Sequence, residues 1–244
     1  MAYGWFEAGW LRTRVLEVPV EGLPDELEGL RIAHLSDFHL GPPSRGAVAV
    51  RRAGAWVRER KPDLTVVTGD LLSHPRGRAQ LDEALRGLGA YVVLGNHDVA
   101  VTRDPFSRAA ALDGVQATLL DDTSLLLDLR GVSVQLAGAA PRFSGSLPDP
   151  DPAAAFRILL SHYPRLRASG FQLVLSGHMH AGQIVVPYPG GKLRLAHPRE
   201  RLTEGLFREG GVTLHVSPGL GTTFVPFRFF ARPEVTELVL RRSG

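Results

Sequence analysis

Short apolar runs alternate with stretches of helical periodicity through the first half of the chain. Apolar runs at residues 31–36, 63–68 and 90–94 have the length and composition of buried strands. Between them, residues 46–60 and 78–88 place apolar side chains at helical spacing. This β-α-β-α-β order predicts a parallel sheet with right-handed crossover connections.

The second half of the chain is rich in predicted strands. They fall at residues 124–129, 132–137, 157–161, 172–176, 183–187, 212–217 and 235–241. Turn signals include Arg130-Gly131 and the Pro-Gly-Gly at 189–191, and residues 144–152 are expected to form a surface loop. Two sheets packed as a sandwich with helices outside fit a single domain over residues 1–244.

Composition restricts the chemistry that this domain can perform. The chain has no cysteine, so disulfides, thiolate metal sites and cysteine nucleophiles are excluded, and any metal must bind oxygen and imidazole nitrogen. The net charge of +3 is a mild excess, carried almost entirely by arginine, because Lys61 and Lys192 are the only lysines. No basic cluster accompanies this charge, which argues against a dedicated nucleic-acid groove without excluding one.

The sequence predicts a cytoplasmic protein with an aromatic N-terminus. No stretch reaches the roughly 18 apolar residues of a membrane span, and the first residues lack the order of a signal peptide. The first ten residues nevertheless include Tyr3, Trp5, Phe6 and Trp10. We expect these side chains to cover the core of the domain, with a peripheral contact to a membrane surface as the alternative.

Polar residues follow five of the predicted strands, at the point where each strand ends. They are Asp37 and His39, then Asp70, then Asn96 with His97 and Asp98, then His162, and last His178 and His180. Residues two apart in an extended chain face the same side, so Asp37 with His39, and His178 with His180, can each converge on one point. Ligands of open α/β sheets bind at the carboxyl ends of strands, so all five groups are expected to meet in one crevice.

Two carboxylates, one amide oxygen and four imidazoles form a hard-to-borderline set of metal ligands. Such a set suits Mn, Fe, Zn, Co or Ni better than Ca or Mg. Seven ligands are too many for one tetrahedral ion but fit two ions roughly 3.5–4 Å apart that share a carboxylate. A pair of this kind binds a phosphoryl oxygen and generates a hydroxide nucleophile near neutral pH. Asn96 is the only asparagine in the chain, which indicates that its amide is needed.

Each of these signals has a simpler structural interpretation. A single aspartate at a strand end usually caps a turn, and a single histidine is usually a core or surface residue. The occurrence of all five signals in order, each after an apolar strand, favours the metal site. His34 lies inside a predicted strand, and His74, His197 and His215 belong to no motif, so these four histidines are interpreted as structural.

The ordered motifs D-x-H at Asp37, G-D at Asp70, G-N-H-D at Asn96, a single His162 and G-H-x-H at His178 resemble those of the calcineurin-like metallophosphoesterase superfamily. The similarity extends to residues 27–37 and to the Ala-Arg-Pro-Glu segment at 231–234, as in a bacterial subgroup of two-metal phosphoesterases. The resemblance implies an α/β fold, a four-layer αββα sandwich of two mixed sheets flanked by helices.

The resemblance also assigns a role to each residue. Asp37, His39 and His180 would hold the first ion, Asn96, His162 and His178 the second, and Asp70 would bridge the two. His97 would stabilise charge on phosphorus and protonate the leaving oxygen, and Asp98 would orient His97. The implied function is hydrolysis of a phosphodiester or phosphomonoester by a hydroxide that two metal ions activate.

The substrate class rests on two local features. The small residues in 177–183 leave room for a bulky leaving group, and residues 223–230 bring four phenylalanines close together. Both favour a small or lipid-like phosphate ester, although the phenylalanines fit core packing equally well. Arg228 is expected to contact a phosphate. The alternatives are a nuclease of the same superfamily and a non-catalytic scaffold, which would not need His97 or Asp98.

Overall fold

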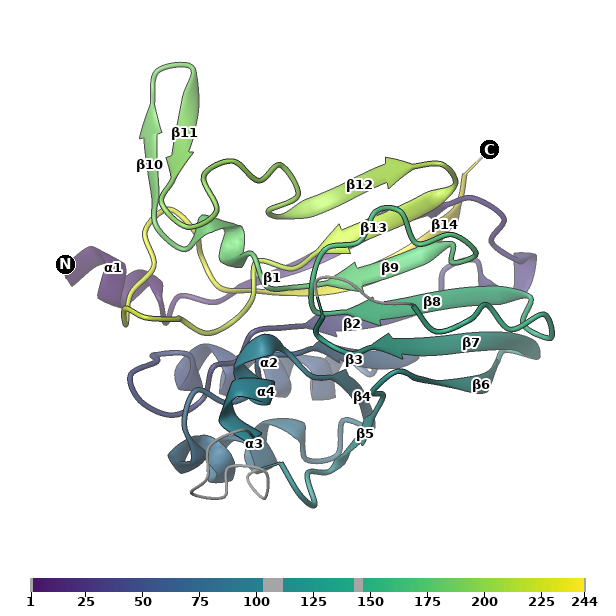
Figure 1. Ribbon diagram of the computed structural model, residues 1–244, viewed down its shortest axis with the longest axis horizontal. Coiled ribbons are helices and arrows are strands. Elements are labelled where there is room, and N and C mark those ends of the chain that lie inside the picture. Colours follow the sequence, from purple (N-terminus) through teal and green to yellow (C-terminus); the bar gives the residue numbers. More distant parts are fainter. Residues whose placement is uncertain (1, 103–111, 143–146, 244) are drawn as a thin grey trace.

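Two six-stranded mixed sheets face each other in the computed structural model, which describes residues 2–102, 112–142 and 147–243 (Figure 1). The order of strands in the first sheet is β1 (Arg12–Val20), β14 (Glu234–Arg242), β2 (Arg31–Leu35), β3 (Leu64–Thr68), β4 (Ala90–Val93) and β5 (Ala117–Leu119). Strands β2 to β5 are parallel, and α2 (Ala47–Arg60) and α3 (Arg78–Leu85) form the first two crossovers. The parallel β-α-β-α-β unit predicted from the sequence is therefore confirmed.

The second sheet has a parallel centre with antiparallel edges. Its order is β12 (Gly205–Glu209), β13 (Val212–Val216), β9 (Leu173–Ser176), β8 (Phe156–Ser161), β7 (Val132–Ala139) and β6 (Thr123–Leu129). Strands β13, β9, β8 and β7 run parallel, and the two outermost pairs are antiparallel. The carboxyl ends of β8 and β9 therefore lie at one end of this sheet, as those of β2, β3 and β4 do in the first.

The main core fills the space between the sheets. Ile32 and Val66 of the first sheet and Phe156 and Ile158 of the second belong to one buried cluster. A second cluster packs α2 and α3 against the outer face of the first sheet. In the described residues the outer face of the second sheet is covered by loops, with Phe171 among their buried side chains. The predicted α/β class with two mixed sheets is confirmed, and its long helices flank the first sheet.

Short elements complete the structure. They are α1 (Ala2–Glu7), α4 (Asn96–Thr102), the hairpin of β10 (Val185–Tyr188) and β11 (Gly191–Arg194), and three single turns at Asp25–Leu27, Pro75–Gly77 and His180–Gly182. The hairpin stands away from the body of the molecule (Figure 1). Residues 147–152 of the predicted loop form no helix or strand, and 144–146 lie outside the described residues. None of the helices in the described ranges is long and apolar enough to cross a membrane.

The aromatic side chains of the N-terminus do not cover the core. Trp5 and Phe6 are 47% and 60% exposed, and Tyr3 and Trp10 are each 42% exposed. The helical spacing of α1 turns Gly4 and Glu7 inward instead, and a Cβ on Gly4 would meet the carbonyl of Arg228 at 2.9 Å. The expectation of a core-covering role for these four aromatic residues was therefore wrong.

Candidate metal centre

Five loops that follow strands bring the predicted ligands together. Asp37 and His39 follow β2, Asp70 follows β3 and Asn96 begins α4 after β4. His162 follows β8, and His178 and His180 follow β9. Three groups of carboxylate and imidazole atoms lie within 4.8 Å of one another: Asp37–His39–His180, Asp70–His162–His178 and His39–Asp70–His97.

The backbone at these residues is held in an uncommon conformation. Asp37, His39, Asp70, His178 and His180 all have left-handed φ angles, between 46° and 72°. Non-glycine residues rarely adopt positive φ, and such strain persists where the surrounding structure fixes it. Here the main chain is tied across the loops, because Asp37 N–H donates to Gly69 O at 2.9 Å and His39 N–H donates to Asp70 O at 2.8 Å.

Asp70 lies between the two groups of predicted ligands. Its Oδ2 is 3.3 Å from Nε2 of His39 and 3.3 Å from Nε2 of His162. Its Oδ1 accepts a hydrogen bond of 2.9 Å from the backbone N–H of His97. One carboxylate oxygen therefore faces both groups, which is the position required of a bridging ligand.

In the first group two imidazole nitrogens point at each other. Nε2 of His39 lies 3.1 Å from Nε2 of His180, and Nε2 of His180 lies 3.5 Å from Oδ1 of Asp37. Two neutral ring nitrogens at this separation repel unless a proton or a cation lies between them. Asp37 is also fixed from behind, because its carboxylate accepts from the backbone N–H of His178 at 3.1 Å.

The second group is oriented by a main-chain carbonyl. Nδ1 of His162 lies 2.8 Å from Thr68 O, to which it can donate only as N–H, and this leaves the lone pair of Nε2 facing the site. That Nε2 lies 3.0 Å from Oδ1 of Asn96 and 3.2 Å from Nδ1 of His178. An amide oxygen, a carboxylate and two imidazoles thus converge, and every donor type suits a divalent transition metal.

The electrostatics of the centre favour a bound cation. Burial lowers the pKa of His178 to about 3 and holds the pKa of His180 well below its usual value, so both rings are neutral, as metal ligation requires. Burial also opposes a charge on His162, but the Asp70 carboxylate outweighs it and raises the pKa of His162 to about 9. The buried carboxylates thus draw positive charge to this point, which a divalent ion would supply.

His97 and Asp98 point in different directions from the start of α4. The ring of His97 lies at the site, 4.8 Å from the ring of His39, and burial lowers its pKa. The carboxylate of Asp98 accepts from the backbone N–H groups of Leu71, Leu72 and Gly95 at 2.9–3.2 Å. Asp98 therefore ties the loop after β3 to the loop after β4 and does not orient His97, because adjacent helical residues do not face each other.

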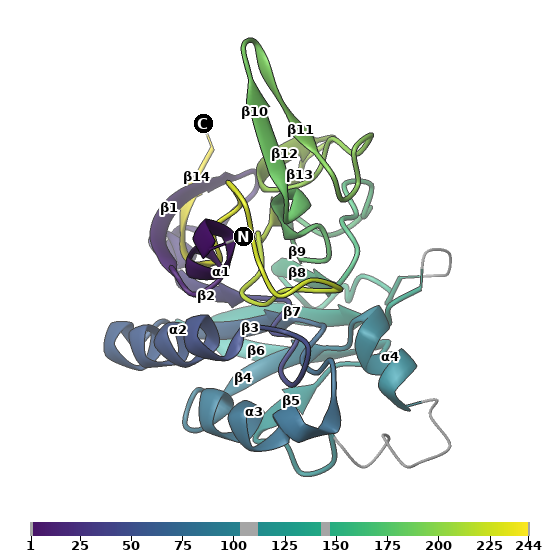
Figure 2. The same ribbon diagram turned by 90° about the vertical axis from the view of Figure 1, so that its left-hand side faces the viewer.

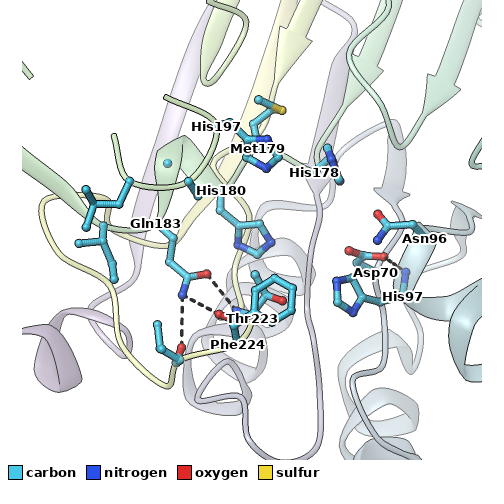
Figure 3. Close-up of a pocket in the computed structure, with 15 residues that line it drawn as sticks. Asp70, Asn96, His97, His178, Met179, His180, Gln183, His197, Thr223 and Phe224 are labelled. Carbon is cyan, nitrogen blue, oxygen red and sulfur yellow. Dashed lines mark hydrogen bonds between the residues drawn. The ribbon is translucent and has the colours of Figure 1, made fainter. Parts of the chain in front are cut away.

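A pocket of about 300 Å³ adjoins the predicted ligands. Figure 3 shows Asp70, Asn96 and His97 across this pocket from Gln183. Its remaining wall is largely apolar and includes Met179, Ile184, Leu195, Phe224 and Val225. The Gln183 amide holds the loop that carries Phe224, since its Oε1 accepts from Thr223 N–H and its Nε2 donates to Thr223 O, both at 2.9 Å.

His197 is a site residue that the sequence did not reveal. It lines the pocket, and its ring lies 5.2 Å from the ring of His178. The ring of Tyr163 also packs on His178, with the ring centroids 4.6 Å apart. Neither residue belongs to a strand-end motif, and only the return of the chain after the β10–β11 hairpin brings His197 to the centre.

The other motif-free histidines are structural, as expected. Nδ1 of His34 lies 2.8 Å from Nδ1 of His215 in the core, and His74 accepts from Arg76 N–H to cap a turn. Arg228, which was expected to contact a phosphate, is completely buried and donates to the carbonyls of Gly221, Pro218 and Ala231. Its guanidinium already satisfies the loop backbone, so the expectation of a phosphate contact was wrong.

The family model of calcineurin-like phosphoesterases matches residues 30–182, more than half of the chain, and this range contains every predicted ligand. The chain belongs to this family. Membership of this family and the Asp/His groups support a hydrolase of the phosphoesterase kind and indicate divalent metal binding.

Curated relatives cover nearly the whole chain. A transmembrane protein with metallophosphoesterase domain from Danio rerio is 33% identical over 93% of the chain and 57% of its own length. The uncharacterized metallophosphoesterase YkuE of Bacillus subtilis is 28% identical over 91% of the chain and 82% of its length. The phosphodiesterase YaeI of Escherichia coli is 27% identical over 97% of the chain and 89% of its own length. The chain thus spans little more than half of the Danio rerio protein.

Proposed function

We propose that this chain hydrolyses a phosphodiester with the help of two divalent transition-metal ions. The observation that carries the proposal is the position of Asp70 Oδ2, 3.3 Å from a ring nitrogen of each ligand group. The name of the Escherichia coli relative, a phosphodiesterase, supports a diester over a monoester. The apolar wall of the pocket supports a substrate with an apolar part, small or lipid-like.

The ligands divide between the two ions around Asp70. Asp37, His39 and His180 would hold one ion, and Asn96, His162 and His178 the other. When bound, such a pair supplies Lewis acidity at the phosphoryl oxygens and lowers the pKa of water. The chain contributes the fixed geometry, because hydrogen bonds to Thr68 O and from His178 N–H orient His162 and Asp37 before any substrate binds.

His97 would act on the substrate. Its ring lines the pocket beside Asp70, and its backbone N–H is anchored on Asp70 Oδ1 at 2.9 Å, so the ring has a defined position relative to both ligand groups. From there its imidazole can hold a proton for the leaving oxygen and stabilise charge on the phosphoryl group. The leaving group would extend toward Phe224, whose ring centroid lies 6.0 Å from that of His97.

The test combines metal analysis with a small panel of substrates. The protein is stripped with a chelator and reloaded with Mn, Zn, Fe, Co or Ni, and the bound metal is counted by mass spectrometry. Hydrolysis of bis-p-nitrophenyl phosphate, p-nitrophenyl phosphate and single-stranded DNA is then followed. We expect two equivalents of metal, and faster hydrolysis of the diester than of the monoester or the DNA.

Variants make the result specific. Asp70→Asn should lose metal from both groups, whereas His74→Ala, a histidine that only caps a turn, should retain both equivalents. Full activity with a single equivalent of metal would contradict the two-metal proposal. Faster cleavage of DNA would favour the nuclease, and two bound ions without hydrolysis of any substrate would favour a scaffold.

A further inference from the structure

Exposed aromatic side chains gather at one end of the molecule. Among the described residues, the aromatic side chains classed as exposed are Tyr3, Trp5, Phe6, Trp10, Tyr188, Phe224 and Phe230, each at least 42% exposed. All lie on residues 3–10, 186–195 and 224–232, which together we call the aromatic face. Figure 2 shows α1 and the β10–β11 hairpin on the side of the molecule that faces the viewer.

The β10–β11 hairpin of the aromatic face is amphipathic. Val186 pairs with Leu193, so both side chains lie on the same face of the hairpin, and Tyr188, two residues after Val186, joins them. The same alternation continues inward to Ile184 and Leu195, which line the pocket. One apolar strip therefore runs from the wall of the pocket to the tip of the hairpin.

The other face of the hairpin carries positive charge. Pro187 pairs with Lys192, and Val185 pairs with Arg194, so both cations lie opposite the apolar strip. The only acidic residue on the three segments of the aromatic face is Glu7, which is completely buried and accepts from the backbone N–H groups of Phe230 and Ala231. The charge of Lys192 is paired, because its Nζ lies 3.2 Å from Oε1 of Glu204 outside these segments, so the face presents apolar side chains and arginines.

Two exposed tryptophans are stacked with arginines. The guanidinium carbon of Arg45 lies 3.5 Å from the ring centroid of Trp5, and that of Arg232 lies 3.8 Å from the centroid of Trp10. Tryptophan and tyrosine prefer the interfacial layer of a bilayer, where the ring is half-buried and the polar edge stays hydrated. Arginine at the same depth meets lipid phosphates.

We propose that the aromatic face docks on the interface of a bilayer that contains anionic phospholipids. Aromatic rings stacked with arginines complement a surface of apolar chains and negative headgroups. The projecting hairpin would place Tyr188 and Leu193 between the headgroups. Docking itself does not depend on the proposed reaction, whereas the entry of a lipid-borne phosphodiester along the apolar strip rests on the proposed function.

The test is co-sedimentation of the full chain with vesicles. Vesicles of phosphatidylcholine with phosphatidylserine are compared with vesicles of phosphatidylcholine alone, at about 0.1 M and 1 M salt, where the Debye length falls from about 10 to about 3 Å. The test variant is Tyr188→Ser with Leu193→Ser. The control is Leu125→Ser with Leu126→Ser, which removes two exposed apolar side chains from β6, outside the aromatic face.

The expected result is binding to anionic vesicles that weakens at high salt. The test variant should bind about tenfold more weakly, because two apolar side chains no longer leave water, and the control should bind like the parent. Failure of the parent to sediment with anionic vesicles, or an equal loss in the control, overturns the proposal. So would sedimentation velocity showing a dimer of the parent that the test variant abolishes, because the face would then join two copies of the chain.

Activity separates this proposal from the proposed function. The test variant should hydrolyse bis-p-nitrophenyl phosphate, which is soluble, at the rate of the parent, because Tyr188 and Leu193 do not line the pocket. Loss of vesicle binding with intact hydrolysis supports docking independently of the reaction. If the parent binds anionic vesicles but hydrolyses no phosphate ester, docking stands and the proposed function fails.

Discussion

Oδ1 of Asn96 lies 3.0 Å from Nε2 of His162, the same nitrogen that faces the Asp70 carboxylate at 3.3 Å. The only asparagine of the chain therefore points its oxygen into the second ligand group. A neutral oxygen leaves a bound ion with more net positive charge than a carboxylate would, which favours binding of an anionic phosphate.

Asn96→Asp is expected to retain metal, or bind it more tightly, while turnover falls. The added negative charge opposes the phosphate and weakens the Lewis acid. Asn96→Ala should instead weaken one ion and make activity depend on high metal concentration. Turnover and metal stoichiometry are measured for both variants. If the amide only capped the turn after β4, Asp would serve equally well, and an unchanged rate in Asn96→Asp would show this.

His97→Ala is expected to retain both metals and lose most of its activity. Groups that transfer protons or stabilise charge typically contribute ~10²–10⁴-fold to the rate. The alternative is that His97 is itself a metal ligand, because its ring nitrogen lies within 4.8 Å of ligand atoms of His39 and Asp70. Loss of a full equivalent of metal in the variant would assign it that role. His74→Ala is the matched control.

The local features of the centre could be predicted from the sequence because each ligand directly follows an apolar strand. The strands at β2, β3, β4, β8 and β9 were predicted to within two residues, and their ends carry the motifs. β1 was missed because its alternating residues, with Arg14 and Glu17 exposed, do not form an apolar run. Its partner β14 lies more than two hundred residues away, so its pairing is not a local property.

Directions of side chains were harder to predict than positions. Asp98 is next to His97 in the chain, yet it contacts the main chain of Leu71 rather than the imidazole. His197 carries no motif and becomes part of the pocket only because the β10–β11 hairpin returns the chain toward the centre. Arg228 was expected to contact the substrate, but its guanidinium donates to three main-chain carbonyl groups that only the folded loop brings together.

The buried carboxylate of Glu237 makes the stability of the fold sensitive to acid. This carboxylate accepts two hydrogen bonds from Arg60, at 2.6 and 3.0 Å, and two from Arg31, at 2.8 and 3.1 Å. Against the effect of burial, these bonds lower its pKa from 4.5 to about 2. A carboxylate whose pKa is lower in the folded than in the unfolded state stabilises the fold at pH values above its unfolded pKa. This contribution is lost as the pH falls from about 4.5 toward about 2.

Glu237→Gln should therefore lower the free energy of unfolding by about 1–3 kcal/mol at pH 7, a range reduced for solvent screening because both arginines are partly exposed. The difference from the parent should shrink as the pH is lowered through the same window. Urea denaturation at a series of pH values is the measurement. Glu17→Gln, at an exposed ion pair, is the control, and an equal effect there would contradict the argument.

Gly95 makes room for the bridging carboxylate, and Gly95→Ala should therefore impair the metal centre. A Cβ at this position would lie against Oδ1, Cγ and the main-chain N of Asp70. The φ of Gly95 is not in the left-handed region, so alanine adds no left-handed strain there and the substitution tests the close approach to Asp70. The main chain and the carboxylate of Asp70 would both have to shift, although its Oδ2 faces both His39 and His162 at 3.3 Å.

We expect Gly95→Ala to fold but to bind metal more weakly and to lose activity by about 10²-fold or more, because a displacement of about 1 Å in a reacting geometry can cost that much. Gly9→Ala is the matched control, since its Cβ would meet only Phe6 O at an ordinary 3.7 Å. Circular dichroism establishes folding, and titration with Mn²⁺ measures affinity. Parent-like affinity and rate in Gly95→Ala would mean that Asp70 can move freely, and a carboxylate that moves freely is not held in place to bridge two ions.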